Sequence, residues 1–275
     1  MEENTEPEIS LIDFKNALSA LDEISQTFKV DVWIPSKNKC FPFKEIDTKQ
    51  QKEILGAAMD SSVYNSTFIN VFYDILKNNL LLEDKTIVDD LTIYDKSCVA
   101  LYLKSQISND LNVLFDEKNN ISKKVLLNEI IEKFKTYKTP EKELIKVLND
   151  KTSLSVEISL PTVLDELQHD KQLSKTYKKT NQVKSNDDVK NIISDAFIVE
   201  TSKYIKKLWI NEIEVELNSD RLDQKIKLIE KLPSALIQKV LEQISKWKKT
   251  VDDILLVEHD EYKKVIGIDS LLFLS

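Results

Sequence analysis

The sequence predicts an α+β fold that is mainly helical, with a small antiparallel β-sheet packed against long C-terminal helices. The first observation is helical periodicity between Ser185 and Leu256, where apolar residues recur every three or four positions. The second is period-two alternation at Val30–Ile34 and Leu154–Leu160, which is typical of half-buried strands. The third is composition, because 41% hydrophobic and 31% charged residues in a chain of 275 are typical of a globular protein with a charged surface.

Residues 1–28 are predicted to form an N-terminal amphipathic helix that begins near residue 8. Its apolar residues fall on one side of a helical projection. They are Ile9, Ile12, Leu18, Leu21 and Ile24.

Residues 29–108 are predicted to form a β-hairpin followed by helices. The alternation at Val30–Ile34, the polar turn at 35–39 and the apolar segment Cys40–Phe43 together indicate two antiparallel strands. Pro42 predicts an edge position for the returning strand, since proline cannot donate a ladder hydrogen bond. Three helices are predicted here, at Thr48–Met59, at Ser61–Leu82 and from Cys98 to about Ser108.

Residues 109–185 are a variable middle region with less regular patterning. A helix is predicted at Val125–Tyr137, and the strand Leu154–Leu160 should end at Pro161. The expected sheet combines this strand with the N-terminal hairpin. A short helix at Thr162–Leu167 should lead into a polar linker over 168–187.

Residues 186–275 are predicted to contain two long helices and an apolar tail. The first helix should begin at the Ser185–Asp188 capping box and continue through Leu208. The second should begin near Asp220 and be divided at Pro233, since proline lacks the N–H that a helix interior requires. Between the two, alternating apolar residues over 213–217 indicate an extended connector.

Composition also excludes several classes of function. The net charge of −8 disfavours nonspecific binding to nucleic acid. The chain's two glycines, Gly56 and Gly267, stand far apart, whereas Walker and dinucleotide phosphate loops need several glycines within a few residues. The nucleophile elbow of serine hydrolases is excluded for the same reason, because it needs a glycine on each side of its serine.

Single titratable residues are expected to have structural roles. Cys40 and Cys98 are predicted to be buried free thiols in a reducing compartment, and His169 and His259 are predicted to lie on the surface. Neither histidine has the spacing to a cysteine or a second histidine that a zinc site needs. The carboxylate pairs lie in polar runs, where helix caps and solvated faces are expected. No catalytic, cofactor-binding or metal-ligating residue is therefore predicted.

No targeting or membrane segment is predicted. The acidic N-terminus lacks the basic start and apolar run of a signal peptide. No apolar window approaches the ~20 residues that a membrane span requires. The protein is therefore expected in the cytosol of the cell that makes it.

Candidate partner-contact residues come from the tryptophans and the apolar C-terminus. Trp209 is expected at a helix end and Trp247 on the long helical stripe, and a core position is favoured over an interface for each. Leu271, Leu272 and Phe273 could dock on their own helices or into a partner, and both alternatives stay open.

Several segments in a fixed order carry a family resemblance. They are Ile34–Lys37, Lys39, Phe41–Phe43, Lys49–Ala58, Leu91–Asp95, Leu101–Ser105, Leu154–Leu167, Ile198–Ile205, Ile229–Pro233 and Ile268–Phe273. In this order they resemble the baseplate hub proteins of T4-like contractile-tailed phages. The chain departs from the family pattern in three ways: Lys104 replaces an expected arginine, a glycine expected after the following serine is absent, and an arginine expected near Phe41 is missing.

The resemblance implies a non-enzymatic role in building the central hub of a tail baseplate. The implied partners are other baseplate hub proteins or tape-measure proteins, and self-association is left open. The implied location is the host cytoplasm during assembly, and the virion baseplate if the protein stays in the particle. Two alternatives remain: a nucleic-acid-associated phage protein that uses Lys-rich helices at Tyr204–Leu208 and Lys246–Thr250, and a metal-dependent enzyme with dispersed carboxylates.

Overall fold

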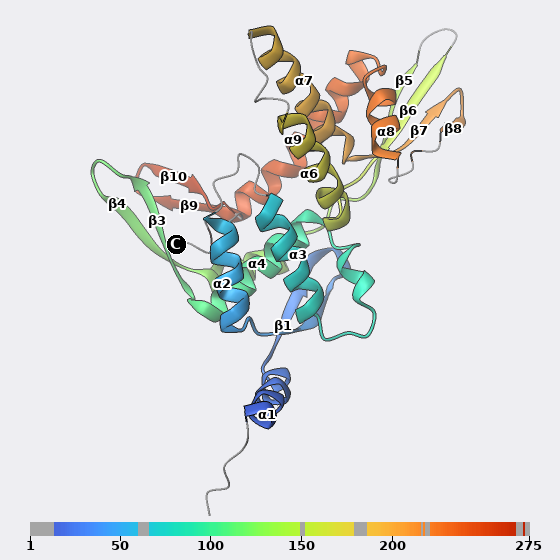
Figure 1. The fold of residues 1–275 in the computed structure, drawn as a ribbon. Helices are drawn as coiled ribbons and strands as arrows, with labels where there is room; N and C mark the ends of the chain where they lie inside the picture. Colours follow the sequence, from blue (N-terminus) through green and yellow to red (C-terminus); the bar gives the residue numbers. More distant parts are fainter. Residues whose placement is uncertain are drawn as a thin grey trace, which may run out of the picture.

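A computed structural model describes residues 14–59, 66–148, 152–178, 186–215, 217, 221–267 and 272. It confirms the mainly helical α+β class with small antiparallel sheets. Figure 1 shows a central helical body from which helix α1 projects at one end. Two hairpins extend from one side of this body, and a four-stranded sheet extends from the other.

The N-terminal hairpin forms as predicted. Strands β1 (Lys29–Ile34) and β2 (Lys39–Lys44) pair antiparallel around the short 3-10 helix η1 (Pro35–Lys37). Asn38 closes the turn with φ of 49°, a conformation that asparagine tolerates better than most residues. The inward-facing residues on both strands are buried and join the main core.

The helices after the hairpin make up most of the central body. They are α2 (Thr48–Ala58), α3 (Ser66–Asn79), the 3-10 helix η2 (Lys85–Val88) and α4 (Ile93–Ile107). Helix α4 begins five residues before the predicted Cys98, because Thr92 and Asp95 form a capping box at its start. The prediction missed this box, so it located the helix by its apolar residues alone.

Asp95 joins the start of α4 to the turn of the N-terminal hairpin. Its carboxylate accepts hydrogen bonds from the Thr92 N–H at 2.7 Å, the Thr92 hydroxyl at 2.8 Å and the Ser36 N–H at 2.8 Å. The side chain is fully buried. It therefore satisfies donors from two segments that would otherwise be desolvated without a partner.

Asp95→Ala is expected to lower the free energy of unfolding by about 2–4 kcal/mol, since a helix cap is lost and the Ser36 N–H is left without its acceptor. The matched control is Asp47→Ala, which removes the exposed capping box of α2 and should cost only about 1 kcal/mol. Urea denaturation of both variants measures the difference. Equal losses would contradict a joining role for Asp95.

The middle region contains a second hairpin that was not predicted from the sequence. Strands β3 (Asp110–Asp116) and β4 (Ile121–Leu126) pair antiparallel, and α5 (Leu127–Lys135) follows directly. Polar residues occupy much of β4, so its alternation is weak. The predicted helix at Val125–Tyr137 corresponds to α5, with its start two residues later.

The middle strand belongs to a four-stranded sheet of its own. Its strands, in spatial order, are β5 (Glu143–Leu148), β6 (Ser153–Ile158), β7 (Ile205–Ile210) and β8 (Ile213–Val215). The prediction that this strand and the N-terminal hairpin share one sheet is wrong, since β1 and β2 pair only with each other among the described strands.

Strand β7 corrects the prediction that the first C-terminal helix continues through Leu208. The register between β6 and β7 shifts at Glu157 and Ile158, so that Lys206 is an extra residue in β7. This bulge lets Ile205 and Leu208, three residues apart, both face the core. Their spacing therefore resembles a helical repeat although the backbone is extended.

Helix α6 (Val163–Lys178) occupies much of the segment where a polar linker was predicted, and it packs against α7 (Asn186–Ser202). Helix α6 runs well past the predicted short helix, and α7 follows it. The linker prediction is wrong for 168–178, because this segment is helical and buries a sparse set of its side chains. The capping box predicted at Ser185 and Asp188 lies outside the described side chains.

The C-terminal helices are divided as predicted. Helix α8 (Leu222–Ile229) ends before Pro233, and α9 (Ser234–Leu255) begins after it. The predicted connector contains β8, joined to β7 by a tight turn in which Asn211 and Glu212 both have positive φ. A further hairpin follows α9 and leads into the predicted apolar tail. Its strands are β9 (Leu256–His259) and β10 (Tyr262–Val265).

The two cysteines differ in their surroundings. Cys98 is fully buried in α4, and this burial raises the pKa of its thiol. Cys40 is exposed, so the prediction that it is buried is wrong. It lies opposite Trp33 in the hairpin. Both residues point away from the buried face of the hairpin, because successive residues of a strand point to opposite faces. Both are free cysteines.

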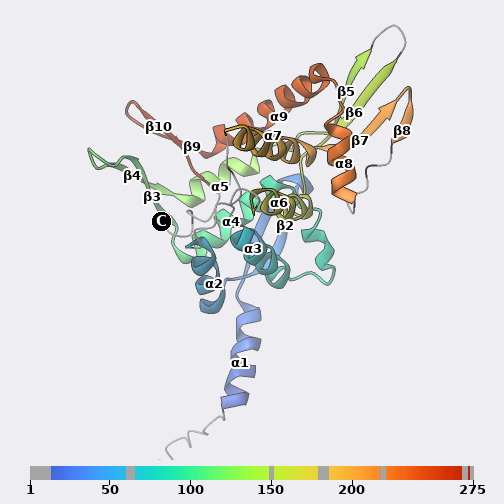
Figure 2. The same ribbon diagram turned by 45° about the horizontal axis from the view of Figure 1, so that its top comes forward.

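Helix α1 (Phe14–Thr27) projects from the body in both views of the fold (Figures 1 and 2). The predicted helix start near residue 8 lies outside the described residues, as do Ile9 and Ile12. Within the described part of the chain, no helix is both long enough and apolar enough to cross a membrane.

Candidate partner-binding surface

Trp209 lies on the open face of the β5–β8 sheet. One row of paired residues, Ile145, Val156, Leu208 and Val215, crosses all four strands and faces the core. The next row is Lys146, Ser155, Trp209 and Glu214. Because successive residues of a strand point to opposite faces, this second row lies on the other side of the sheet.

A hollow surrounds Trp209 on this face. Its volume is about 360 Å³. The half-buried indole has open space beside it, because the neighbouring Ser153 and Ser155 are small. Leu144 and Leu148 remain 49% and 71% exposed, so the hollow has exposed apolar side chains among its polar ones. The full set of lining residues is Leu144, Lys146, Leu148, Ser153, Leu154, Ser155, Trp209 and Glu212.

Charged residues frame the hollow with both signs. The Lys207 ammonium lies 5.8 Å from the centre of the Trp209 ring and also pairs with Glu214 at 3.2 Å. Lys142, just before β5, pairs with Glu157 of β6 at 3.5 Å. An apolar centre with a polar rim is the usual arrangement of a protein-binding surface.

The far end of the sheet is apolar on its other face too. Ile210 and Ile213, which flank the β7–β8 turn, are both exposed. Figure 2 shows this end of the sheet extending away from the helical body. The surface defined by Leu144, Leu148, Trp209, Ile210 and Ile213 is called the sheet-tip surface below.

The other candidate contact residues have different surroundings. Trp247 is buried in the main core, the position that the sequence favoured. Trp209 lies on a strand and not at a helix end. Leu272 is buried and belongs to the same core as Trp247. Leu271 and Phe273 lie outside the described residues.

His169 is buried, so the prediction that it lies on the surface is wrong. Its Nδ1 lies 2.6 Å from the Asp165 carbonyl oxygen, which can only accept, so the neutral ring carries its proton there. Its Nε2 lies 2.8 Å from the Ser202 hydroxyl oxygen, whose single proton can be donated to Nε2 or to the Val199 carbonyl oxygen, which is also 2.8 Å away. These bonds join α6 to the end of α7, and burial lowers the pKa of His169 to about 4. His259, by contrast, is half-buried on β9.

Charged side chains surround this histidine. Burial alone would raise the pKa of Asp165, but Lys206 and hydrogen bonds from Thr162 hold it below its usual value. Lys225 is buried, and desolvation with repulsion from Lys206 lowers its pKa to about 8. Burial and nearby carboxylates raise the pKa of Asp170.

The His169–Ser202 pair has the residue types of a base and a nucleophile, and its two residues belong to helices that pack together. Both side chains are buried. Neither residue lines the hollow beside Trp209 or the larger hollow described below. The contact between the two side chains links α6 to the end of α7.

Acid is expected to destabilise the protein through His169. The unfolded chain binds this proton near pH 6.5 and the folded protein only near pH 4, so the unfolded state holds more protons between these values. Stability should therefore fall by about 3 kcal/mol as the pH drops through this window. Denaturation of wild type and His169→Gln at several pH values tests this. A variant with the same pH dependence as wild type would contradict it.

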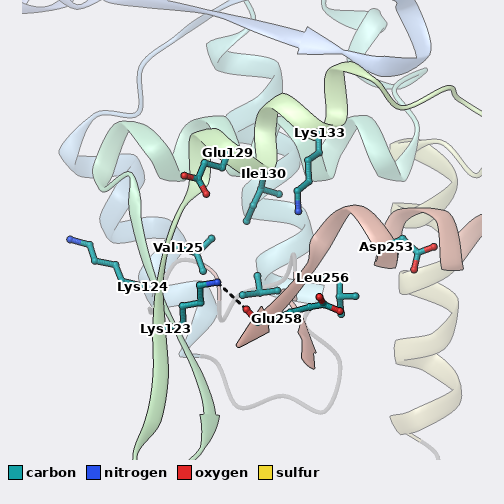
Figure 3. A pocket seen from close by; sticks show the side chains of 10 residues that line it. Lys123, Lys124, Val125, Glu129, Ile130, Lys133, Asp253, Leu256 and Glu258 are labelled. Carbon is teal, nitrogen blue, oxygen red and sulfur yellow. Dashed lines mark hydrogen bonds between the residues drawn. The ribbon is translucent and has the colours of Figure 1, made fainter. Parts of the chain in front are cut away.

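A larger hollow lies between the β3–β4 and β9–β10 hairpins, beneath α5 (Figure 3). Its volume is about 560 Å³. The Lys123 ammonium crosses it to the Glu258 carbonyl oxygen at 2.9 Å, and Lys264 donates to the Leu114 carbonyl oxygen at 2.8 Å. These bonds connect the two hairpins. Lysines and carboxylates both line the hollow, so it has no dominant charge.

Potential metal ligands do not gather in the part of the chain that the structure describes, whereas Lys246, Lys248 and Lys249 of α9 are exposed. No three histidine, cysteine or carboxylate side chains gather there in an arrangement that could hold a metal ion. The Lys-rich segment Tyr204–Leu208 is mostly strand β7 and not a helix. Its Lys206 pairs with Asp165, and its Lys207 pairs with Glu214.

The sequence contains a signal for part of this surface. Strand β5 has apolar residues at both even-numbered and odd-numbered positions, namely Leu144, Ile145, Val147 and Leu148. This pattern indicates a strand with apolar residues on both faces of its sheet. The prediction contains no strand there, because the segment shows no simple alternation.

The chain was also compared with known proteins. Comparison with protein-family models, with curated proteins and with solved structures found no match.

Proposed function

We propose that this protein is a non-enzymatic assembly factor that binds another protein through the sheet-tip surface. The observation that carries the proposal is the hollow beside the half-buried Trp209, together with the exposed Leu144 and Leu148 that line it. Tryptophan in a concave, apolar setting is among the residue types most often found at the energetic centre of an interface. Exposed apolar surface of this kind is otherwise unfavourable in water.

The resemblance to T4-like baseplate hub proteins supplies the class of partner. We propose hub or tape-measure proteins of the same phage as the binding partners, with the contact made in the host cytoplasm during tail assembly. If the contact persists, the protein would be a component of the virion baseplate. The mixed charges around the hollow suit a protein partner better than a nucleic acid, whose phosphates require a basic surface.

The test is co-purification of the full chain with each candidate hub and tape-measure protein. A complex with at least one of them supports the proposal, and Trp209→Ala should disrupt that complex. Leu126→Ala is the matched control, since Leu126 is an exposed apolar residue on β4, outside the sheet-tip surface. No complex with any candidate would count against the proposal.

A further inference from the structure

Helix α1 carries an exposed apolar stripe. Leu18, Leu21 and Ile24 are 47%, 61% and 52% exposed, and Phe28, directly after the helix, is 54% exposed. Both views of the fold show the helix projecting from the body on the segment that leads into β1 (Figures 1 and 2). An isolated helix of 14 residues is only marginally stable in water. A partner that covers the stripe would therefore stabilise it.

The spacing of the stripe fits another helix. In the sequence, Phe14, Leu18, Leu21 and Ser25 of α1 follow one another at intervals of four, three and four residues, whereas the exposed Ile24 lies beside this row and Phe28 follows the last helical residue, Thr27. This is the a and d pattern of a heptad repeat, which forms the seam between two supercoiled helices. A flat sheet or an irregular surface would not require this repeat.

The charges beside the seam favour a second copy of the same helix. Lys15 and Asp22 are seven residues apart in the sequence, so they hold the same heptad position, e. In an antiparallel pair the e positions of the two helices meet, which brings the Lys15 position of each copy near the Asp22 position of the other. In a parallel pair the e position meets g, where this sequence has Ala17 and Ile24.

We propose that α1 forms an antiparallel two-helix coiled coil with α1 of a second copy, which makes the protein a dimer. This contact is separate from the sheet-tip surface, since the two lie on different parts of the fold (Figure 1). Dimer formation and partner binding can therefore be tested independently.

The first test is the mass of the full chain by sedimentation equilibrium across a concentration series. Wild type should approach twice the 31.8 kDa chain mass as concentration rises. Leu21→Glu should remain at the chain mass, whereas Ser19→Glu, on the polar side of α1, should behave as wild type. A monomer at every concentration, or a dimer unaffected by Leu21→Glu, would overturn the proposal.

The second test uses charge exchange, which leaves the apolar seam intact. Lys15→Glu and Asp22→Lys should each weaken self-association several-fold, because like charges then meet across the pair. A mixture of the two variants should associate more tightly than either alone, since opposite charges meet again. Equal association of the mixture and the separate variants would exclude the antiparallel arrangement.

Discussion

Trp247→Ala is expected to lower the free energy of unfolding by about 3–5 kcal/mol, the usual cost of removing a large aromatic side chain from a core. Trp247 is buried and packs in the main core from the middle of α9. The measurement is chemical denaturation followed by circular dichroism. Because α9 contacts β5, the loss should also loosen the sheet that carries Trp209.

Trp209→Ala provides the matched comparison for stability. Its indole is only half-buried and borders an open hollow, so its removal should cost much less than the removal of Trp247. A loss equal to that of Trp247→Ala would mean that Trp209 is a core residue. Trp209 would then not be available as the central contact residue of the sheet-tip surface.

Trp209→Ala should instead weaken partner binding by about 2 kcal/mol or more, which corresponds to roughly a 30-fold rise in Kd. The indole offers a large rigid contact area, and the interaction of Lys207 with its ring should become more favourable as water is excluded. Trp209→Phe should retain part of the affinity, because it keeps an aromatic ring. Isothermal titration with the partner identified by co-purification measures these changes. Unchanged affinity in Trp209→Ala would contradict the proposed surface.

Periodicity predicted the elements that follow one simple repeat. The N-terminal hairpin, helices α2 and α9 and the division at Pro233 follow from alternation, helical spacing and proline chemistry. Strand β7 was missed because its bulge gives Ile205 and Leu208 a helical spacing. The start of α4 depended on the capping box of Thr92 and Asp95, which apolar spacing does not reveal.

Long-range packing explains the remaining differences. Polar residues 168–178 form a helix because a few of them are buried where α6 packs against α7, and no local pattern shows that partner. His169 is buried for the same reason, since its Nε2 contacts the hydroxyl of Ser202 in α7. Trp209 was identified as a candidate, but its neighbours Leu144 and Leu148 were not, because their contact depends on strand pairing.

The most direct test of the account is hydrogen exchange of the full chain with and without its partner. The account predicts slower exchange of backbone amides in β5, β7 and β8 when the partner is bound, with little change in the distant β3–β4 hairpin. Slower exchange confined to that hairpin, or none in the β5–β8 sheet, would contradict a partner-binding role for the sheet-tip surface.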